Sequence, residues 1–194
     1  FINGCDNSYH PCQILADALT ILEKFGTLDV NLMYIGAKNN VFNSHVEFFS
    51  KMKKGTLYGL TPLVNETACG PDFYEEAKKS GHYIELDPSM SMEEAKEYAN
   101  KMDVLYTDTW VDMEFFNNPA YQKQKEETLA KMMPYQLNGD FTKDSKAIVF
   151  HDMPMHVGFE ISQDVVDKNL DHILDEAENR RHAEKAVMYT LLNS

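Results

Sequence analysis

The sequence predicts an α/β protein built on a doubly wound parallel sheet, with helices on both faces of the sheet. Short apolar or β-branched runs alternate along the chain with longer amphipathic segments, which is typical of successive strand–helix units. Glycine and proline stand between many of these segments, where turns are expected. The chain has 194 residues, 43% of them hydrophobic, which is enough for one core. We therefore expect a single domain over residues 1–194.

Five short runs are the expected strands. Gly36 follows the first run and Pro62 closes the second, and both residues are suited to ending a strand. Mainly apolar runs without strict alternation are typical of parallel strands that are covered on both faces. The expected strands are residues 30–35, 56–60, 82–86, 104–107 and 147–150.

Six amphipathic segments are the expected helices. In the first, apolar side chains recur at helical spacing between Ile14 and Leu22, and Gly26 is a natural stop. Ser91 followed by Glu94 is the signature of a capping box, which predicts the start of the fourth helix. The expected helices are residues 10–25, 45–54, 72–80, 91–102, 122–132 and 176–192.

Composition excludes some classes of partner. The chain carries 31 acidic against 18 basic residues, a formal net charge of -13, which disfavours nucleic acid and anionic membranes as partners. No apolar run is long enough to span a bilayer. Acidity is compatible with a cationic substrate, but it more often reflects solubility alone.

Cysteine usage bears on the cellular compartment, and the first residues bear on whether the chain is part of a longer protein. The three cysteines, Cys5, Cys12 and Cys69, are odd in number and widely spaced, which argues against a disulfide framework and for a reducing, cytoplasmic compartment. Residues 1–4 contain no initiator Met and no basic, apolar leader. We therefore expect a chain that is entered in the middle of a longer protein.

The expected site lies at the carboxyl ends of the strands, where loops gather in doubly wound folds. Three polar segments follow apolar strands: residues 36–40, 108–113 and 151–154. Taken singly, Asn39 and Asn40 are compatible with a simple turn. Asp108 is suited either to capping a turn or to holding an ammonium group.

Two helix segments also have two interpretations. His10 and Gln13 flank Pro11 at a helix start, which is either an ordinary first turn or a clamp for anionic or carbonyl oxygens. Residues 176–180 form either a solvated helix face with charge pairs or part of a site.

Taken together and in order, these segments resemble the carbamoyltransferase family, and within it the second, amino-acid-binding domain of ornithine carbamoyltransferases. The resemblance runs from residue 2 to about residue 190. It is carried by HPCQ with LAD (10–17), GAKNNVFNS (36–44), DVLYTDTWV (103–111), YQLN (135–138), HDMP followed by GFEI (151–161), and DEAENRRH (175–182).

The resemblance implies a Rossmann-like fold and an enzyme that transfers a carbamoyl group from carbamoyl phosphate to ornithine or a related amino acid or diamine. It implies no metal and no cofactor, and a homotrimer for the full-length protein. The phosphate-gripping STRT segment of the family's first domain is absent, so the chain is expected to be a fragment or a half-enzyme that lacks the carbamoyl-phosphate-binding domain. The implied catalytic residues are His10, Gln13, His151, Asp152 and Arg180, and the implied substrate-binding residues are Asn40, Asp108, Asp112, Met113 and Met153.

Four positions depart from the family pattern. Asp152 stands where the family has Cys, Asp112 replaces a Ser, Glu114 a Gly, and Ala37 an Asp. Extra carboxylates bind a cation well but favour the protonated amine, which cannot attack. The departures therefore suggest a different, more cationic substrate or a loss of turnover. A non-catalytic binding or regulatory paralogue is the competing hypothesis.

Overall fold

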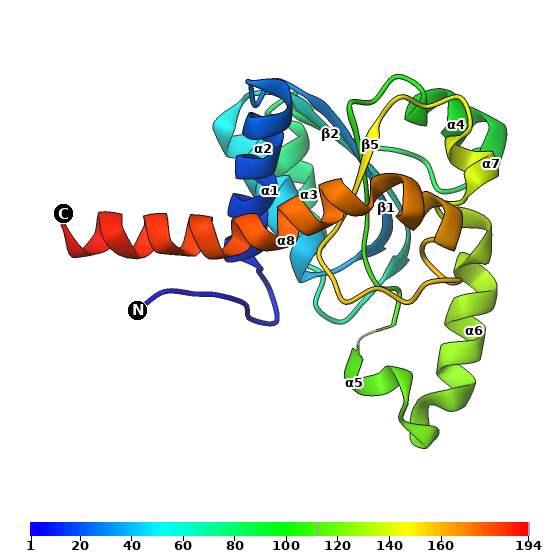
Figure 1. Cartoon of the computed structure of the whole chain (residues 1–194). Coiled ribbons are helices and arrows are strands. Elements are labelled where there is room, and N and C mark those ends of the chain that lie inside the picture. Colours follow the sequence, from blue (N-terminus) through cyan, green and yellow to red (C-terminus); the bar gives the residue numbers. More distant parts are fainter. Residues whose placement is uncertain (112, 194) are drawn as a thin grey trace.

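Five parallel strands form one sheet in a computed structural model that describes residues 1–111 and 113–193. The order of the strands is β3-β2-β1-β4-β5 (Figure 1), and every neighbouring pair is parallel. The predicted doubly wound parallel sheet is confirmed. The strands are β1 (Asn31–Lys38), β2 (Thr56–Val64), β3 (Tyr83–Glu85), β4 (Val104–Thr107) and β5 (Ile148–His151).

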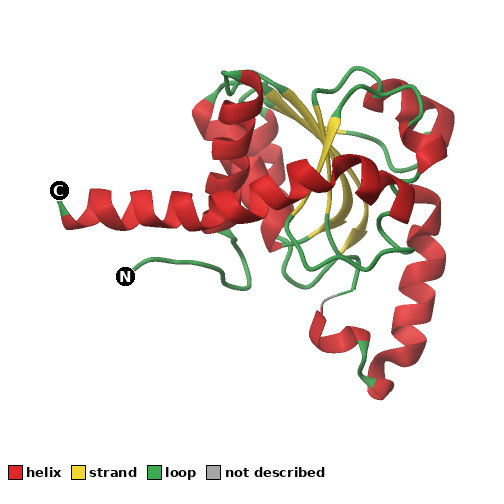
Figure 2. Ribbon diagram, viewed as in Figure 1, coloured by secondary structure: helices red, strands yellow, loops and turns green. Residues whose placement is uncertain are grey.

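Helices cover both faces of the sheet (Figures 1 and 2). One face is covered by α1 (Pro11–Phe25), α2 (Asn40–Met52) and α3 (Pro71–Lys78). The other is covered by α4 (Met92–Ala99), α7 (Gly139–Thr142) and the first turns of α8 (Gln163–Leu192). Two further helices, α5 (Met113–Phe116) and α6 (Gln122–Met132), and the 3₁₀ turns Pro119–Tyr121 and Met133–Tyr135 complete the described elements.

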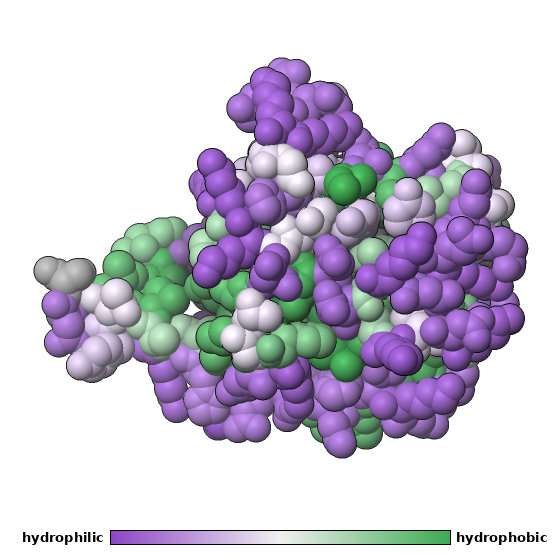
Figure 3. Space-filling model, turned by 90° about the horizontal axis from the view of Figure 1, so that it is seen from above, coloured by the Kyte–Doolittle hydropathy of each residue, from purple (hydrophilic) through white to green (hydrophobic). Residues whose placement is uncertain are grey.

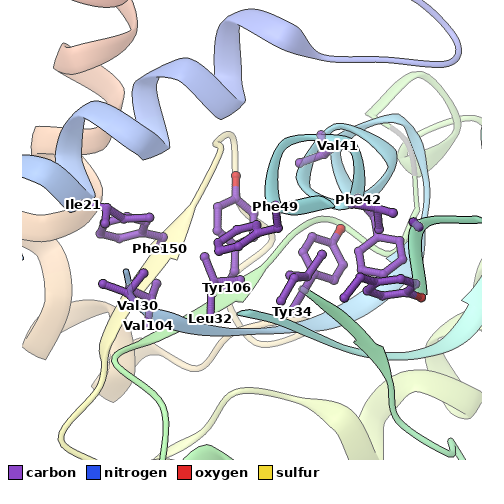
Figure 4. Close-up of a cluster of buried hydrophobic side chains, with 14 of the residues drawn as sticks. Ile21, Val30, Leu32, Tyr34, Val41, Phe42, Phe49, Val104, Tyr106 and Phe150 are labelled. Carbon is purple, nitrogen blue, oxygen red and sulfur yellow. The ribbon is translucent and has the colours of Figure 1, made fainter. Parts of the chain in front are cut away.

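The core has two halves because successive side chains of a strand point to opposite faces of the sheet. In β1, Leu32 and Tyr34 pack under α1 and α2 (Figure 4), while Met33 and Ile35 pack on the opposite side against α4. All four side chains are fully buried. Burying one such side chain stabilises a fold by about 1.5–3 kcal/mol.

Two positions favour glycine, one for its backbone conformation and one for lack of space. Gly26 ends α1 in the left-handed conformation, at φ 70°, which glycine adopts without a steric penalty. A Cβ added to Gly59 in β2 would lie 2.6 Å from Cζ of Phe42. The ring of Phe42 thus fills the space that glycine leaves.

Several predicted elements are confirmed within one or two residues. They include α1, β4 and α6. The capping box is present: the Ser91 hydroxyl accepts from the Glu94 amide, and the Glu94 carboxylate accepts from the Ser91 amide.

Two predicted helix starts are wrong. Helix α2 begins at Asn40 and not at residue 45, because Asn39 is extended and its side chain caps the helix by accepting from the Phe42 amide. Helix α8 begins at Gln163 and not at residue 176. Its early turns bury Val165, Val166 and Ile173. These apolar residues are widely spaced in a segment rich in charged residues, so they do not form a recognisable helical pattern. The strands β1 and β2 also run three and four residues past their predicted ends, and α5 and α7 were not predicted.

The end of α8 projects from the body of the protein (Figure 1). Apolar residues gather on the projecting arm in Figure 3, where Met188 is 46%, Tyr189 72% and Leu192 84% exposed. Ala183, earlier in the same helix, is buried. In the described part of the chain, no helix combines the length and the apolar content needed to cross a membrane.

Candidate functional site

A hollow of about 190 Å³ opens at the carboxyl edge of the sheet. It lies where β1, β4 and β5 end, which is the expected position of a site in a doubly wound fold. The hollow is lined by His10, Asn39, Asn40, Val41, Asp108, Thr109, Asp152, Met153 and Pro154. Five of the ten predicted site residues are therefore brought together here.

Asp108 follows β4 and is buried, with a relative exposure of 5%. Its Oδ2 accepts a hydrogen bond of 2.6 Å from the Asn39 amide. Its Oδ1 accepts from the Thr109 backbone N–H at 2.5 Å. Two N–H groups from two loops thus hold a single carboxylate against the hollow.

Asp152 follows β5, and its side chain is 11% exposed. It lines the same hollow as Asp108. Burial, followed by the negative charge of Asp108, raises the pKa of Asp152 well above its usual range. The Asp152 carboxyl group therefore tends to be neutral while no cation is bound.

His10 is the N-cap of α1, and its backbone N–H donates to the Ser44 hydroxyl at 2.7 Å. Burial and then the charge of Arg180 lower the pKa of the imidazole to about 4, so the ring is neutral near pH 7. Its Nε2 lies 3.4 Å from Nη1 of Arg180 and can accept from it. Its Nδ1 is buried without a hydrogen-bond partner among the described residues. A neutral ring that accepts at Nε2 carries its proton on Nδ1, where it is free to donate to a ligand.

Arg180 joins His10 to Gln13 from α8. Its Nη1 lies 3.4 Å from both His10 Nε2 and Gln13 Oε1, and its Nε donates to Glu184. The Arg180 side chain is 34% exposed, so part of it is accessible to solvent. Gln13 is buried, and its amide nitrogen donates to Asp17 and Glu176.

Asn40 lies at the first turn of α2 and reaches the N-terminal segment. Its amide nitrogen donates to the Asp6 carbonyl oxygen at 2.8 Å, and its Oδ1 accepts from the Val41 amide. Asn40 lines the hollow, but this N–H group is already engaged by residue 6.

His151 ends β5 but does not line the hollow. Its Nδ1 accepts from the Met153 N–H at 3.0 Å, and its Nε2 lies 3.2 Å from Oε1 of Glu160. The ring is therefore fully engaged inside the loop. Met153 has a positive φ of 46° and is 40% exposed at the rim of the hollow.

Two predicted site residues fall at the edge of what the structure describes. Asp112 lies outside the described residues. Met113 begins α5, and nothing is described of its side chain. Their predicted roles remain predictions.

Three residues that hold the site together were not predicted as site residues. Asn39 donates a hydrogen bond to Asp108. Asp17 and Glu176 accept hydrogen bonds from the Gln13 side chain. A signal for the latter two is present in the sequence. Asp17 lies four residues after Gln13, and Glu176 four before Arg180, and this spacing puts both members of each pair on one helix face.

The arrangement has two chemical halves. Asp108 and Asp152 provide negative charge suited to an amine or ammonium group. His10 and Arg180 provide N–H donors suited to a carbonyl or phosphate oxygen. The hollow is therefore equipped to hold an amine next to an oxygen-rich group.

Comparison with known proteins identifies relatives along almost the whole chain. Residues 28–191 match the family model described as "Aspartate/ornithine carbamoyltransferase, Asp/Orn binding domain". The chain is similar to the ornithine carbamoyltransferase of Chlorobaculum tepidum, with 35% identity over 99% of this chain and 54% of that protein. It is 37% identical to the ornithine carbamoyltransferase of Pyrococcus horikoshii, over 98% of this chain and 58% of that protein. The chain thus spans little more than half the length of these relatives.

Solved structures agree with the sequence comparison. The ornithine carbamoyltransferase from Pyrococcus furiosus is similar with a TM-score of 0.76 and 32% identity, over 95% of this chain and 57% of that one. The anabolic ornithine carbamoyltransferase from Campylobacter jejuni is similar with a TM-score of 0.81 and 26% identity, over 99% of this chain and 61% of that one.

Proposed function

The chain belongs to the aspartate/ornithine carbamoyltransferase family, and we propose that it is the amino-acid-binding half of a carbamoyltransferase. The full-length protein transfers the carbamoyl group of carbamoyl phosphate to the amine of ornithine or of a related amino acid or diamine. The products are citrulline, or an analogous ureido compound, and phosphate. In this proposal residues 1–194 form the amino-acid-binding domain, and a carbamoyl-phosphate-binding domain lies elsewhere in the protein.

One observation carries the proposal: a buried pair of carboxyl groups shares a hollow with a neutral histidine. Asp108 and Asp152 line the hollow together with His10, and Arg180 lies 3.4 Å from the His10 ring. The carboxyl groups suit the amine of the acceptor. The Nδ1–H group of His10 and the Arg180 guanidinium suit the oxygens of carbamoyl phosphate.

The proposed step needs positioning and charge stabilisation. The neutral amine nitrogen forms a bond to the carbamoyl carbon, and the bond from that carbon to the bridging phosphate oxygen breaks. Phosphate leaves with the proton that the amine gives up. His10 and Arg180 donate to the oxygen on which negative charge develops. Gln13 orients the carbamoyl group, and Asn40 binds near the α-carboxylate of the acceptor. Asp108 orients its amine, and Asp112, Met113 and Met153 complete this side of the site.

The remaining parts of the proposal concern assembly and cofactors. We expect the full-length protein to be a homotrimer in the cytoplasm, with each phosphate grip completed by a neighbouring subunit. The transfer itself requires no metal and no cofactor, because both bonds change at one activated carbon. His151 stabilises the loop that carries Asp152 through its bonds to Met153 and Glu160.

A specific observation also favours a non-catalytic alternative. Asp152 replaces the family's Cys beside Asp108, and an additional carboxylate stabilises the protonated amine, which is not a nucleophile. In this alternative the protein binds a cationic amine without transferring a carbamoyl group to it.

Turnover of carbamoyl phosphate by the full-length protein separates the two functions. The measurement is the release of phosphate and the formation of a ureido product with ornithine, putrescine and lysine as acceptors. We expect turnover with at least one acceptor, and its loss in Asp108→Asn. If the protein binds an amine but releases no phosphate with any acceptor, the transferase proposal is wrong and the binding alternative holds.

A further inference from the structure

Two carboxyl groups lie buried directly beneath the site, on helices that are far apart in the sequence. Asp17 on α1 and Glu176 on α8 are both fully buried. The Nε2 atom of Gln13 donates to Asp17 Oδ1 at 2.9 Å and to Glu176 Oε1 at 2.8 Å. One amide group thus bridges two acids that no solvent reaches.

This bridge determines which atom of Gln13 faces the site. Both N–H bonds of the amide point to carboxyl oxygens, so the carbonyl oxygen Oε1 points away from them. That oxygen lies 3.4 Å from Nη1 of Arg180, on the side of the ligand-binding groups. A reversed amide would set Oε1 against two acceptor oxygens, which is repulsive.

Glu176 uses both of its oxygens as acceptors. Its Oε1 accepts from Gln13, and its Oε2 accepts from the backbone N–H of His151 at 2.9 Å. Both ends of this carboxyl group thus face N–H donors, while burial and then the negative charge of Asp17 raise the pKa of Glu176 well above its usual range. Glu176 therefore connects α1 and α8 to the end of β5.

Asp17 is in a different position, because its second oxygen faces a histidine. Oδ2 of Asp17 lies 3.1 Å from Nε2 of His45, and Nδ1 of His45 lies 2.9 Å from the Val41 carbonyl oxygen. Nδ1 must carry a hydrogen, since a carbonyl oxygen only accepts. Neither Oδ2 nor Nε2 has another partner among the described residues. A proton must therefore lie between these two atoms.

The surroundings assign this proton to Asp17. His45 is fully buried, and its ring packs 4.4 Å from the Tyr106 ring and 5.8 Å from the Tyr34 ring. Burial lowers the pKa of His45 to about 4 and raises the pKa of Asp17 to about 7. The titratable groups that act on this pair from neighbouring elements are Tyr106, Asp108, Glu176 and Arg180.

We propose that Asp17 is a neutral, proton-donating positioning residue, which donates to His45 and, together with Glu176, holds Gln13 with its carbonyl oxygen toward the ligand. Asp17 itself contacts no substrate. The part of this inference that assigns Gln13 to the carbamoyl group rests on the proposed function. The protonation of Asp17 does not depend on it.

Nuclear magnetic resonance of this chain, labelled with ¹⁵N in histidine, tests the protonation directly. We expect a neutral His45 ring at pH 6, with its proton on Nδ1, and the same tautomer in Asp17→Asn, whose amide N–H replaces the acid proton. An imidazolium signal from His45 at pH 6 would overturn the proposal. This measurement remains decisive even if the full-length protein transfers no carbamoyl group.

Kinetics of the full-length protein test the positioning role. We expect Asp17→Leu and Glu176→Gln each to raise the KM for carbamoyl phosphate by roughly tenfold or more, as for the loss of a hydrogen bond of about 1.4 kcal/mol. In Glu176→Gln, an amide N–H group replaces one of the two acceptor oxygens. It then faces the N–H donor of either Gln13 or His151, and that hydrogen bond is lost. Asp17→Asn is expected to restore most of the loss seen in Asp17→Leu. Equal losses in Asp17→Asn and Glu176→Gln, or no loss in any of the three variants, would overturn the positioning role of Asp17 and Glu176.

Discussion

Asp152 illustrates how a single residue changes the electrostatics of the site. It stands beside Asp108 in the same hollow, where the family pattern has an uncharged thiol. Burial and Asp108 raise the pKa of its carboxyl group. A bound ammonium group reverses this balance: it favours ionisation of Asp152, and the carboxylate in turn raises the pKa of the ammonium.

The pH optimum of transfer should therefore be higher in the wild-type protein than in Asp152→Cys. Only the free amine attacks, and an ammonium whose pKa is raised loses its proton at a higher pH. Removing the carboxylate should move the rising limb of the profile of kcat against pH to lower values. Superimposable profiles of the two full-length proteins would mean that Asp152 does not act on the amine.

Arg180 should contribute to the binding of carbamoyl phosphate. Arg180→Ala removes a charge-assisted hydrogen bond, which typically contributes about 1.5–3 kcal/mol, so the Kd should rise by roughly 10- to 150-fold. Arg181→Ala is the matched control, because Arg181 is exposed and, among the described residues, pairs with Glu178 of its own helix alone. An exposed pair of this kind contributes about 0–1 kcal/mol. Titration calorimetry that finds the same Kd for both variants would contradict the role of Arg180.

At the scale of elements, the start of α2 links folding to the site. Asn39 is buried at the end of β1, where its Oδ1 caps α2 and its amide nitrogen holds Asp108. The same side chain thus ends the turn between strand and helix and orients a carboxylate from β4. The two consecutive asparagines have different roles. Asn39 caps α2 and holds Asp108, whereas Asn40 donates a hydrogen bond to the Asp6 carbonyl oxygen.

Asn39→Ala should lower both stability and substrate binding. Loss of a helix N-cap typically costs about 0.5–2 kcal/mol of stability, and Asp108 also loses its 2.6 Å partner. Ser91→Ala is the control: it removes a cap of the same kind from α4, which lies away from the hollow. Chemical denaturation should give losses of about 1 kcal/mol or more for both variants. Only Asn39→Ala should weaken ornithine binding, and equal binding by both variants would argue against the coupling.

Helix α8 spans the whole molecule, and its three parts have different roles. Its first turns cover one face of the sheet, its middle supplies Glu176 and Arg180, and its last turns leave the body (Figure 1). The exposed side chains Met188, Tyr189 and Leu192 form an apolar surface on that arm (Figure 3). Such a surface favours association with another apolar surface.

This chain should therefore self-associate at high concentration. Sedimentation velocity is expected to show oligomers that dissociate on dilution. The double variant Met188→Glu and Leu192→Glu should remain monomeric, because it introduces charge on the exposed arm. A variant with the exposed, already polar residue Glu178 changed to Gln is the control. A monodisperse monomer of the unaltered chain at all concentrations would show that the arm does not drive association.

Sequence patterns were sufficient to predict the fold class and the family. Alternating short apolar runs and amphipathic segments are local patterns, so the parallel sheet and the start of α4 at Ser91 were predictable. The segments around His10, Asp108 and Arg180 also established the family resemblance, which the comparisons confirm. The position of loops after β1, β4 and β5 followed, because carboxyl ends of parallel strands meet at one edge.

The tertiary structure alone decided what each polar side chain contacts. His151 and Asp152 are adjacent in the sequence, yet one ring is engaged by Glu160 while its neighbour lines the hollow. Asp17 and Glu176 are 159 positions apart in the chain and meet only because α8 packs on α1. Hydrogen-bond partners and desolvation depend on contacts between distant segments, and these two quantities set the protonation and orientation of every polar group at the site.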